Sequence, residues 1–446
     1  MQALSAIGRW PLWIAAALAL AYLPAWWASY QFDDYKVIVG NPVVQSWPAL
    51  AADFGTGIRP LLKLGYWLSW RLGAGAPWAF VALNLGLHLA ASGLVYALGR
   101  RLYALTGVAA EPARLAALLA ALLFALHPAQ TESVTYICGR SSAQSGLLML
   151  AALLAYDRQL SGGPRWPAVL LWLAALASKE TAAVLPLALL LWDALARADD
   201  AWRARLRRLA PYALLLALAA LLALPHSNYR DFFATSLATR GPADNALQQI
   251  PALGWLLRGA LLLRAPNIDP DLRLVAGVDA ALLMPAALLL GLLLLALALR
   301  RWRWPAFCAA WALVFLLPTN SLLARLDLAN DRQLYLPLAA LAWSLGWALA
   351  WLARRQPASG RLLAGALLSA LATLTALRNL DYRSESALWA ATLQESPEKA
   401  RVLSNHGAAL WLSGEPGAAE AAFRAALARD PGYAPARTNL RRLTGE

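Results

Sequence analysis

Long uninterrupted apolar runs constrain this chain more than any other feature of its sequence. The clearest is "AALLMPAALLLGLLLLALAL", from Ala280 to Leu299. A run of about 20 apolar residues is long enough to cross the hydrocarbon core of a bilayer as a helix. The chain has 446 residues, 60% of them hydrophobic, and several such runs. The sequence therefore predicts an all-α, polytopic membrane protein.

The positions of the basic residues explain the formal net charge of +14. They gather in short segments between apolar runs, as in "RARLRR" at 203–208 and "RRWR" at 300–303. Basic loops that alternate with less basic ones mark the cytoplasmic side of a membrane protein. The charge therefore indicates topology rather than binding to nucleic acid.

With the basic loops as inner markers, we predict a bundle of about eleven transmembrane helices, an uncleaved first helix and a cytoplasmic N-terminus. The predicted spans are 11–28, 77–98, 114–127, 141–156, 166–178, 181–196, 211–225, 280–299, 305–318, 334–352 and 362–378. The outer loops are then 29–76, 127–140, 226–279 and 319–333, with a tight outer turn at 178–181. The apolar piece "IPALGWLLRGALLLRAP" within 226–279 is expected to lie at the interface or to re-enter, because a single crossing would leave "RRWR" outside.

The two cysteines give no disulfide framework. Cys138 falls in a predicted outer loop and Cys308 near the inner end of a predicted helix, so they lie on opposite faces of the membrane.

The sequence changes character after Arg378, and we predict two domains, a membrane domain at 1–380 and a short helical domain at 381–446. Residues 400–433 have a 34-residue helix-turn-helix pattern typical of a tetratricopeptide repeat. Its characteristic positions are Gly407, Leu410, Ala419, Phe423, Ala426 and Pro431. One repeat with flanking half-repeats is too short to bury a continuous core, so it is expected to lean on the membrane domain. A plain helical hairpin is the alternative.

Two adjacent carboxylates, Asp33 and Asp34, begin the first outer loop in "SYQFDDYKVIVGNPVVQS". A carboxylate at a partly dry interface has a raised pKa and can take a proton from an alcohol. The alternative is that both acids cap a loop or a short helix.

Three further polar clusters fall in predicted outer loops. The first, "HPAQTESVTYICGRSS", contains His127, Glu132 and Arg140 between two apolar helices, where titratable groups are costly and often functional. The second is "SKET", in which Lys179 and Glu180 either form a mutual ion pair or serve a function. The third, "NDRQLYLP", places Arg332 where a guanidinium could bind a phosphate or act as an interfacial anchor.

Taken in chain order, eight segments carry a resemblance to a known family. They are "FDDYKVIVGNPVVQ", "IRPLLKLGYWLSWRLG", "PWAFVALNLGLHL", "HPAQTESVTYICGRSS", "SKET", "LPTN", "DRQLYLP" and "RNLDYRSESALW". Together with the repeat, they resemble the transmembrane and tetratricopeptide-repeat-containing O-mannosyltransferases, within the GT-C class of membrane glycosyltransferases. The resemblance implies inverting transfer of one sugar, mannose or similar, from a polyprenyl-phosphate carrier to a protein hydroxyl at the outer face of the membrane.

By this resemblance Asp33 or Asp34 is the base, and we favour Asp34. The resemblance also implies that His127, Glu132 and Glu180 line the substrate pocket. Arg140 or Lys179 would face the carrier phosphate, with Arg332 the first choice for that role. A divalent cation held by Asp34 and Glu132 stays open, because related enzymes often need none.

The short repeat departs from the long arrays of the animal members. With the Ala/Leu/Arg-rich composition it suggests a bacterial homologue in the inner membrane, with the C-terminal repeat in the periplasm. Transfer to a lipid or a cell-wall glycan is one alternative. A non-catalytic membrane scaffold or a transporter is an alternative of another class. The sequence determines neither the sugar, the acceptor nor the oligomeric state.

Overall fold

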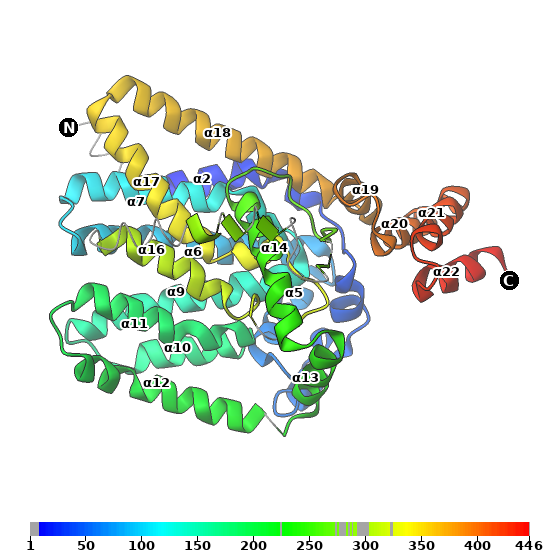
Figure 1. Cartoon of the computed structure of the whole chain (residues 1–446), viewed down its shortest axis with the longest axis horizontal. Coiled ribbons are helices and arrows are strands. Elements are labelled where there is room, and N and C mark those ends of the chain that lie inside the picture. Colours follow the sequence, from blue (N-terminus) through cyan, green and yellow to red (C-terminus); the bar gives the residue numbers. More distant parts are fainter. Residues whose placement is uncertain are drawn as a thin grey trace.

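The protein is built from helices packed along one direction, with a helical arm at one end (Figure 1). The structure, a computed structural model, describes residues 9–223, 225–272, 274, 275, 282, 283, 286, 287, 289–291, 303–321 and 324–445. Within these residues there is no β-strand, which confirms the predicted all-α class. The predicted span 280–299 falls mostly outside the described residues.

The long helices of the bundle coincide with predicted spans. They are α2 (Trp10–Ala21), α6 (Pro77–Leu105), α7 (Ala110–Leu126), α9 (Arg140–Leu160), α10 (Trp166–Leu176), α11 (Leu185–Ala196), α12 (Trp202–Ala223), α16 (Arg303–Leu316), α17 (Pro337–Arg355) and α18 (Pro357–Asp381). A proline opens α6, α17 and α18, where its missing N–H would have had no helical partner.

Four described helical segments are long and apolar enough to cross a membrane: 77–105, 137–160, 202–223 and 357–381. Residues 110–126 and 128–134 add a fifth if this pair, bent by 54°, is counted as one span. The polytopic class is thus supported, while the count of eleven spans stays a prediction.

Helix α7 forms the centre of the bundle and packs against α6 and α17. Every residue of α7 from Ala116 to Leu126 is buried, because its small and aliphatic side chains let neighbouring helices approach on all sides. On α17, Gly346 permits the closest approach: a Cβ there would lie 2.5 Å from the carbonyl oxygen of Ala116.

The other described helices outside the arm gather towards the same end of the bundle as the C-terminal arm, on the right in Figure 1. They are η1 (Leu23–Trp27), η2 (Tyr35–Val39), α3 (Pro42–Gln45), α4 (Trp47–Asp53), α5 (Pro60–Gly73), η3 (Pro128–Gln130), α8 (Thr131–Val134), η4 (Ile137–Gly139), η5 (Glu180–Val184), α13 (Ser227–Thr239), α14 (Pro242–Ala260) and η8 (Asp331–Leu334). The first part of the apolar piece expected at the interface lies in α14. This helix is not among the described helices that are long and apolar enough to cross a membrane.

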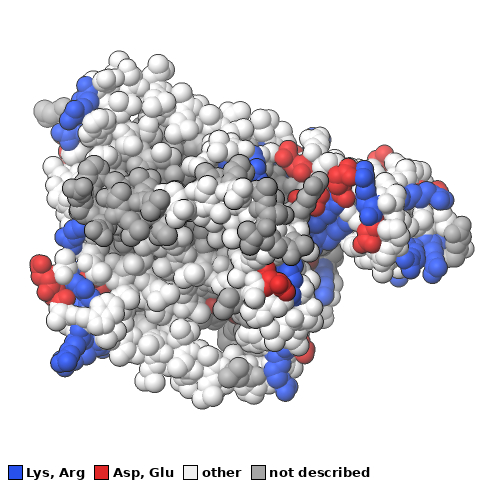
Figure 2. Space-filling view, in the orientation of Figure 1, with Lys and Arg blue, Asp and Glu red and all other residues white. Residues whose placement is uncertain are grey.

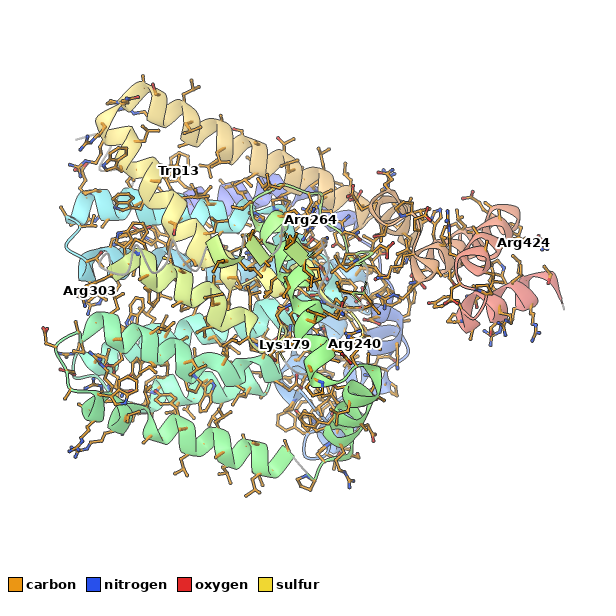
Figure 3. All side chains as sticks on the ribbon, viewed as in Figure 1. Trp13, Lys179, Arg240, Arg264, Arg303 and Arg424 are labelled. Carbon is orange, nitrogen blue, oxygen red and sulfur yellow. The ribbon has the colours of Figure 1, made fainter. Side chains whose placement is uncertain are left out.

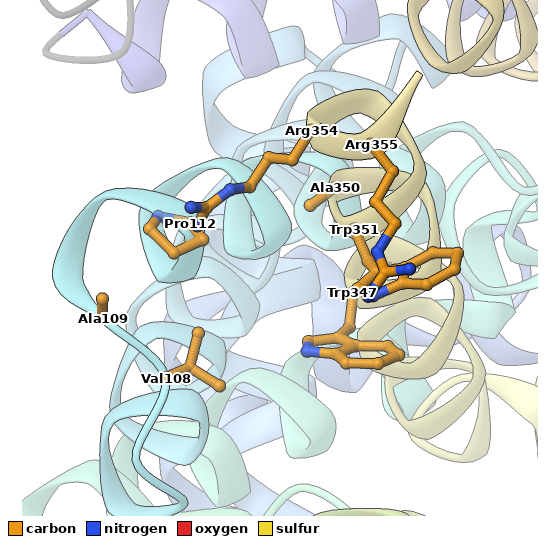
Figure 4. Close-up of a pocket in the computed structure, with 8 residues that line it drawn as sticks. All are labelled: Val108, Ala109, Pro112, Trp347, Ala350, Trp351, Arg354 and Arg355. Carbon is orange, nitrogen blue, oxygen red and sulfur yellow. The ribbon is translucent and has the colours of Figure 1, made fainter. Parts of the chain in front are cut away.

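Among the residues that the structure describes, most charged side chains on the visible face lie towards the two ends of the molecule (Figure 2). This distribution suits a protein whose middle faces lipid. At the end opposite the arm, Trp347, Trp351, Arg354 and Arg355 of α17 help to line a pocket of about 450 Å³ (Figure 4). This pocket lies far from the predicted site residues at the other end.

The arm consists of α19 (Glu385–Glu395), α20 (Ala400–Leu412), α21 (Pro416–Arg429) and α22 (Ala434–Thr444), packed in consecutive pairs. Phe423 is fully buried, and a Cβ at Gly407 would meet its ring at 2.9 Å. Lys399 and Arg401 form ion pairs with Asp269, so the arm contacts the bundle. The assignment to tetratricopeptide repeats stays a prediction.

Gly346→Ala should destabilise the bundle by about 1–3 kcal/mol, because the new methyl group overpacks the α7–α17 contact. The matched control is Gly365→Ala, where a Cβ meets no atom within 4 Å. Thermal unfolding in detergent should show a lower midpoint for the first variant and an unchanged or higher midpoint for the second. Equal midpoints would contradict the close approach at Gly346.

Candidate functional site

The two adjacent carboxylates lie in the turn between η1 and η2. Phe32, which precedes them, has a φ of 40°, a left-handed conformation that is strained for a bulky residue. The carboxylates have different surroundings: Asp34 is fully buried, whereas Asp33 is partly exposed. From the sequence we favour Asp34 as the base, and this difference in burial bears on that choice.

Asp34 ties the first outer loop to the loop after α7. Its Oδ1 accepts a hydrogen bond from the backbone N–H of Cys138 at 2.9 Å, and its Oδ2 accepts one from Gln31 at 2.9 Å. Burial raises the pKa of Asp34 from 3.8 to about 7, although these hydrogen bonds act in the opposite direction. Both carboxylate oxygens therefore already have backbone partners.

Glu132 and Arg332 form the central ion pair of the site. Glu132 lies in α8 and is 3% exposed, and its carboxylate lies 3.3 Å from the Nε of Arg332. The backbone N–H of Arg332 donates to the same carboxylate at 3.3 Å. Burial opposes the charge of Arg332, but Glu132, Tyr136, Asp327 and Asp33 together raise its pKa. Asp33 thus lies within electrostatic reach of this guanidinium.

Arg332 lines two separate pockets. The first, called here the cationic pocket, is lined by Ser142, Ser145, Met149, Lys179, Thr181, Phe315, Thr319, Arg325, Asn330, Arg332, Gln333, Tyr335, Leu336 and Pro337. The second, called the arm pocket, is lined by Phe32, Glu132, Tyr136, Ile268, Asp269, Asp327, Arg332, Leu388, Trp389 and Arg401. One guanidinium therefore faces both an anion-attracting space and a space walled by the C-terminal arm.

Three cationic side chains converge on the cationic pocket: Lys179, Arg325 and Arg332. Lys179, at the arm end of the bundle in Figure 3, donates to the hydroxyl of Ser142 at 2.6 Å. Burial, followed by the charges of Arg332, Arg325 and Arg59, holds the pKa of Lys179 well below its usual value. Burial also lowers the pKa of Arg325 to about 10. An anion bound here would relieve this mutual repulsion.

Glu180 does not neutralise Lys179. Its carboxylate is held in a two-point hydrogen bond by Arg59, at 2.9 and 2.7 Å, and also accepts from the hydroxyl of Tyr229 at 3.3 Å. The mutual Lys179–Glu180 ion pair considered from the sequence is therefore replaced by Arg59–Glu180, and Glu180 lines neither pocket.

His127 and Arg140, expected at the pocket, lie elsewhere. The two ring nitrogens of His127 bind the backbone N–H of Ala129 and the carbonyl of Ala260, so this side chain closes the end of α7. Arg140 is fully buried and donates to Asn84, to Ser69 and to a backbone carbonyl of α6, with its guanidinium over the rings of Tyr66 and Phe80. Neither residue lines the cationic pocket or the arm pocket.

Sequence reasoning missed several residues that the structure brings to the pockets. Arg325 follows the "LPTN" segment, and Asn330 and Gln333 flank the predicted Arg332. For Asn330 and Gln333, closeness in sequence to the predicted Arg332 was the only feature that could have pointed to the pocket. Trp389 and Arg401 reach the arm pocket from the C-terminal helices, a contact between distant segments that no local pattern indicates.

The described residues contain no group of three or more His, Cys, Asp or Glu side chains placed to hold a metal ion. Asp34 and Glu132, the pair considered for a divalent cation, use their carboxylates for different partners: Asp34 for two backbone N–H groups, and Glu132 for Arg332.

Comparison with known proteins gives consistent matches to one kind of enzyme. Protein O-mannosyl-transferase Tmtc1 of Drosophila melanogaster is 32% identical over 189 residues, which are 38% of this chain and 21% of that protein. Protein O-mannosyl-transferase TMTC1 of Mus musculus is 34% identical over 166 residues, or 34% of this chain and 17% of that protein. Over about a third of its length, the chain is similar to protein O-mannosyl-transferases.

These matches confirm the predicted resemblance to protein O-mannosyltransferases over about a third of the chain, and the bacterial origin stays a prediction. The matches span only about a fifth of these relatives' own length. No family model matches the chain, and no solved structure matches it.

Asp34→Asn should destabilise the site by about 1–3 kcal/mol, because an amide nitrogen replaces one acceptor oxygen and leaves a buried N–H without a partner. A raised carboxyl pKa stabilises the fold fully below pH 3.8, and this contribution is lost as the pH rises through about 7. Unfolding midpoints between pH 4 and pH 8 should therefore fall less steeply in this variant than in the wild type.

The partly exposed Asp33 offers the matched control. Asp33→Asn removes a neighbouring negative charge that helps to raise the pKa of Asp34, so it should weaken the dependence of the unfolding midpoint on pH less than Asp34→Asn does. If Asp34→Asn kept the wild-type dependence, Asp34 would not be the group that titrates.

Proposed function

We propose that this protein is an inverting glycosyltransferase that moves a single sugar, mannose or a similar one, from a polyprenyl-phosphate carrier to a protein hydroxyl. The reaction would take place on the periplasmic face of a bacterial inner membrane. One observation carries the proposal: Arg332 lies between the cationic pocket and the arm pocket, with Glu132 beside it and Asp33 within electrostatic reach. The names of the relatives support the same reaction class.

The cationic pocket suits the carrier phosphate. Lys179, Arg325 and Arg332 provide positive charge for a phosphate that becomes more negative as the sugar leaves. The same pocket has apolar lining from Met149, in the middle of α9, and Phe315, near the end of α16, where a prenyl chain could remain in lipid.

The burial of the two aspartates favours Asp33 over Asp34 as the base. A general base must come within hydrogen-bond distance of the hydroxyl proton that it removes. Asp33 is partly exposed, and no hydrogen bond or ion pair to another described residue occupies its carboxylate. Asp34 is fully buried with both oxygens engaged, so we assign it the role of holding the loop against Cys138.

In the proposed reaction, Asp33 removes the proton of the acceptor hydroxyl. The hydroxyl oxygen attacks the anomeric carbon from the face opposite the phosphate and forms the new glycosidic bond. The bond between the anomeric carbon and the phosphate oxygen breaks, and its electron pair leaves with the polyprenyl phosphate. Arg332 and Lys179 stabilise that charge. Because the hydroxyl attacks from the face opposite the phosphate, the configuration at the anomeric carbon is inverted.

The arm pocket suits the acceptor. Phe32 and Trp389 pack edge to face with their ring centroids 5.5 Å apart, so the loop that carries Asp33 contacts α19 directly. A peptide bound against the arm would therefore present its hydroxyl next to this loop. A lipid or cell-wall glycan acceptor would have no comparable need for the arm.

Asp33→Asn should lower kcat for sugar transfer by about 10²-fold or more, since it removes the general base. The assay uses purified protein in proteoliposomes with radiolabelled polyprenyl-phosphate mannose and a Ser/Thr-rich peptide. Unfolding midpoints measured alongside would separate loss of chemistry from loss of fold. Wild-type kcat in a folded Asp33→Asn variant would exclude Asp33 as the base.

Trp389→Ala should raise KM for the peptide acceptor several-fold and leave KM for the lipid donor unchanged, because Trp389 lines only the arm pocket. Leu412→Ala, on the same arm at a position that is 76% exposed, is the control. An unchanged acceptor KM for Trp389→Ala, with transfer to glycolipids instead of peptide, would favour the lipid or glycan acceptor.

A further inference from the structure

Two buried amide side chains in the cationic pocket have no hydrogen-bond partner among the described residues. Asn330 is fully buried and Gln333 is 8% exposed, and neither the oxygen nor the nitrogen of either amide is bonded. A buried polar group without a partner costs about 1–3 kcal/mol. Four such atoms in one pocket therefore destabilise the fold unless a ligand forms hydrogen bonds with them.

Every other buried Asn or Gln among the described residues is bonded through at least one side-chain atom. Gln31 and Gln130 each have an unbonded oxygen but donate through the amide nitrogen. Asn320 donates to Gln249 at 2.9 Å, and Gln249 in turn donates to Asn245 at 3.3 Å. Gln144 donates to the carbonyl of Leu61 and to the hydroxyl of Ser178. The contrast sets Asn330 and Gln333 apart.

Local backbone geometry explains how both amides reach the same space. The N–H of Gln333 donates to the carbonyl of Asn330 at 3.1 Å, which closes the first turn of η8 around Arg332. The side chain of Asn330 does not cap this helix. Both amides line the cationic pocket together with Lys179 and Arg332.

We propose that Asn330 and Gln333 bind hydroxyl groups of the donor sugar and select a neutral sugar with free neighbouring hydroxyls. The inference rests on the proposed function, because it places the sugar next to the carrier phosphate. An amide offers both a donor and an acceptor, which matches a sugar hydroxyl that also offers both. The surrounding cations repel a cationic amino sugar.

The pocket measures about 40 Å³, room for only a few water molecules. A sugar ring therefore enters by displacing flexible side chains of the lining, such as Lys179 and Met149. If Lys179 moved towards the carrier phosphate, its ammonium group would come closer to the negative charge of that phosphate.

The test compares the affinity of the full-length protein in nanodiscs for three short-chain lipids. They are polyprenyl phosphate, polyprenyl-phosphate mannose, and polyprenyl phosphate with a cationic 4-amino-4-deoxy sugar. Wild-type protein should bind the mannose lipid about 10-fold more tightly than the sugar-free lipid, a difference of about 1.4 kcal/mol. It should bind the amino-sugar lipid less tightly than the mannose lipid.

Asn330→Leu and Gln333→Met replace each amide by an apolar group of similar size. Both variants should bring the affinity ratio of mannose lipid to sugar-free lipid close to about 1, while the Kd for the sugar-free lipid stays constant. Their unfolding midpoints should not fall, because no hydrogen bond within the described fold is lost. Gln249→Met, which breaks a satisfied amide pair, is the control that should lower the midpoint and keep the ratio.

Three outcomes would overturn the inference: an unchanged ratio in both amide variants, an equal loss of affinity for all lipids, or tightest binding of the amino-sugar lipid by the wild type. If the wild type bound none of the three lipids, the proposed donor itself would fail. That result differs from a variant-specific loss, so the two failures can be told apart.

Discussion

The ion pair between Arg332 and Glu132 is the interaction on which the arrangement of the site depends. A charge buried at this depth is stable only with a partner, so α8 and η8 must lie together. The adjacent Asp331 faces the other way, pairs with Arg264 and accepts from the N–H of Asn267. Asn267 donates to Ser396, at the end of α19, the first helix of the arm. A single turn of helix thus links both pockets and the C-terminal arm.

Much of the fold followed from hydrophobic pattern and charge. Ten predicted spans overlap helices of the bundle, because an apolar run in lipid can satisfy its backbone only as a helix. The predicted first and last residues of these spans were less accurate than their positions along the chain. Helix α6 continues to Leu105 and α12 begins at Trp202, since basic residues at membrane ends remain helical while their charges reach water. The first helix ends at Ala21, just before Pro24.

The site was predictable in part. Glu132, Lys179 and Arg332 could be predicted as site residues because each is a titratable group next to apolar helices. In the structure each of them lines the cationic pocket or the arm pocket. His127 and Arg140 had the same local signature but bind backbone and polar groups within the bundle. The local sequence shows that a polar residue lies near a predicted membrane helix. It does not show whether the folded chain places a hydrogen-bonding or charged partner beside that residue.

The attachments of the acidic loop also bear on how the protein is made. The backbone N–H of Ser29 and the side chain of Gln31 both donate to the carbonyl of Tyr382, 351 positions beyond Gln31. The N–H of Phe32 donates to Glu385. A chain emerging from the ribosome has neither partner until α18 has been inserted and α19 has followed it. The carboxylates are therefore synthesised first, and the loop that carries them gains these partners only after the C-terminal helices have been made.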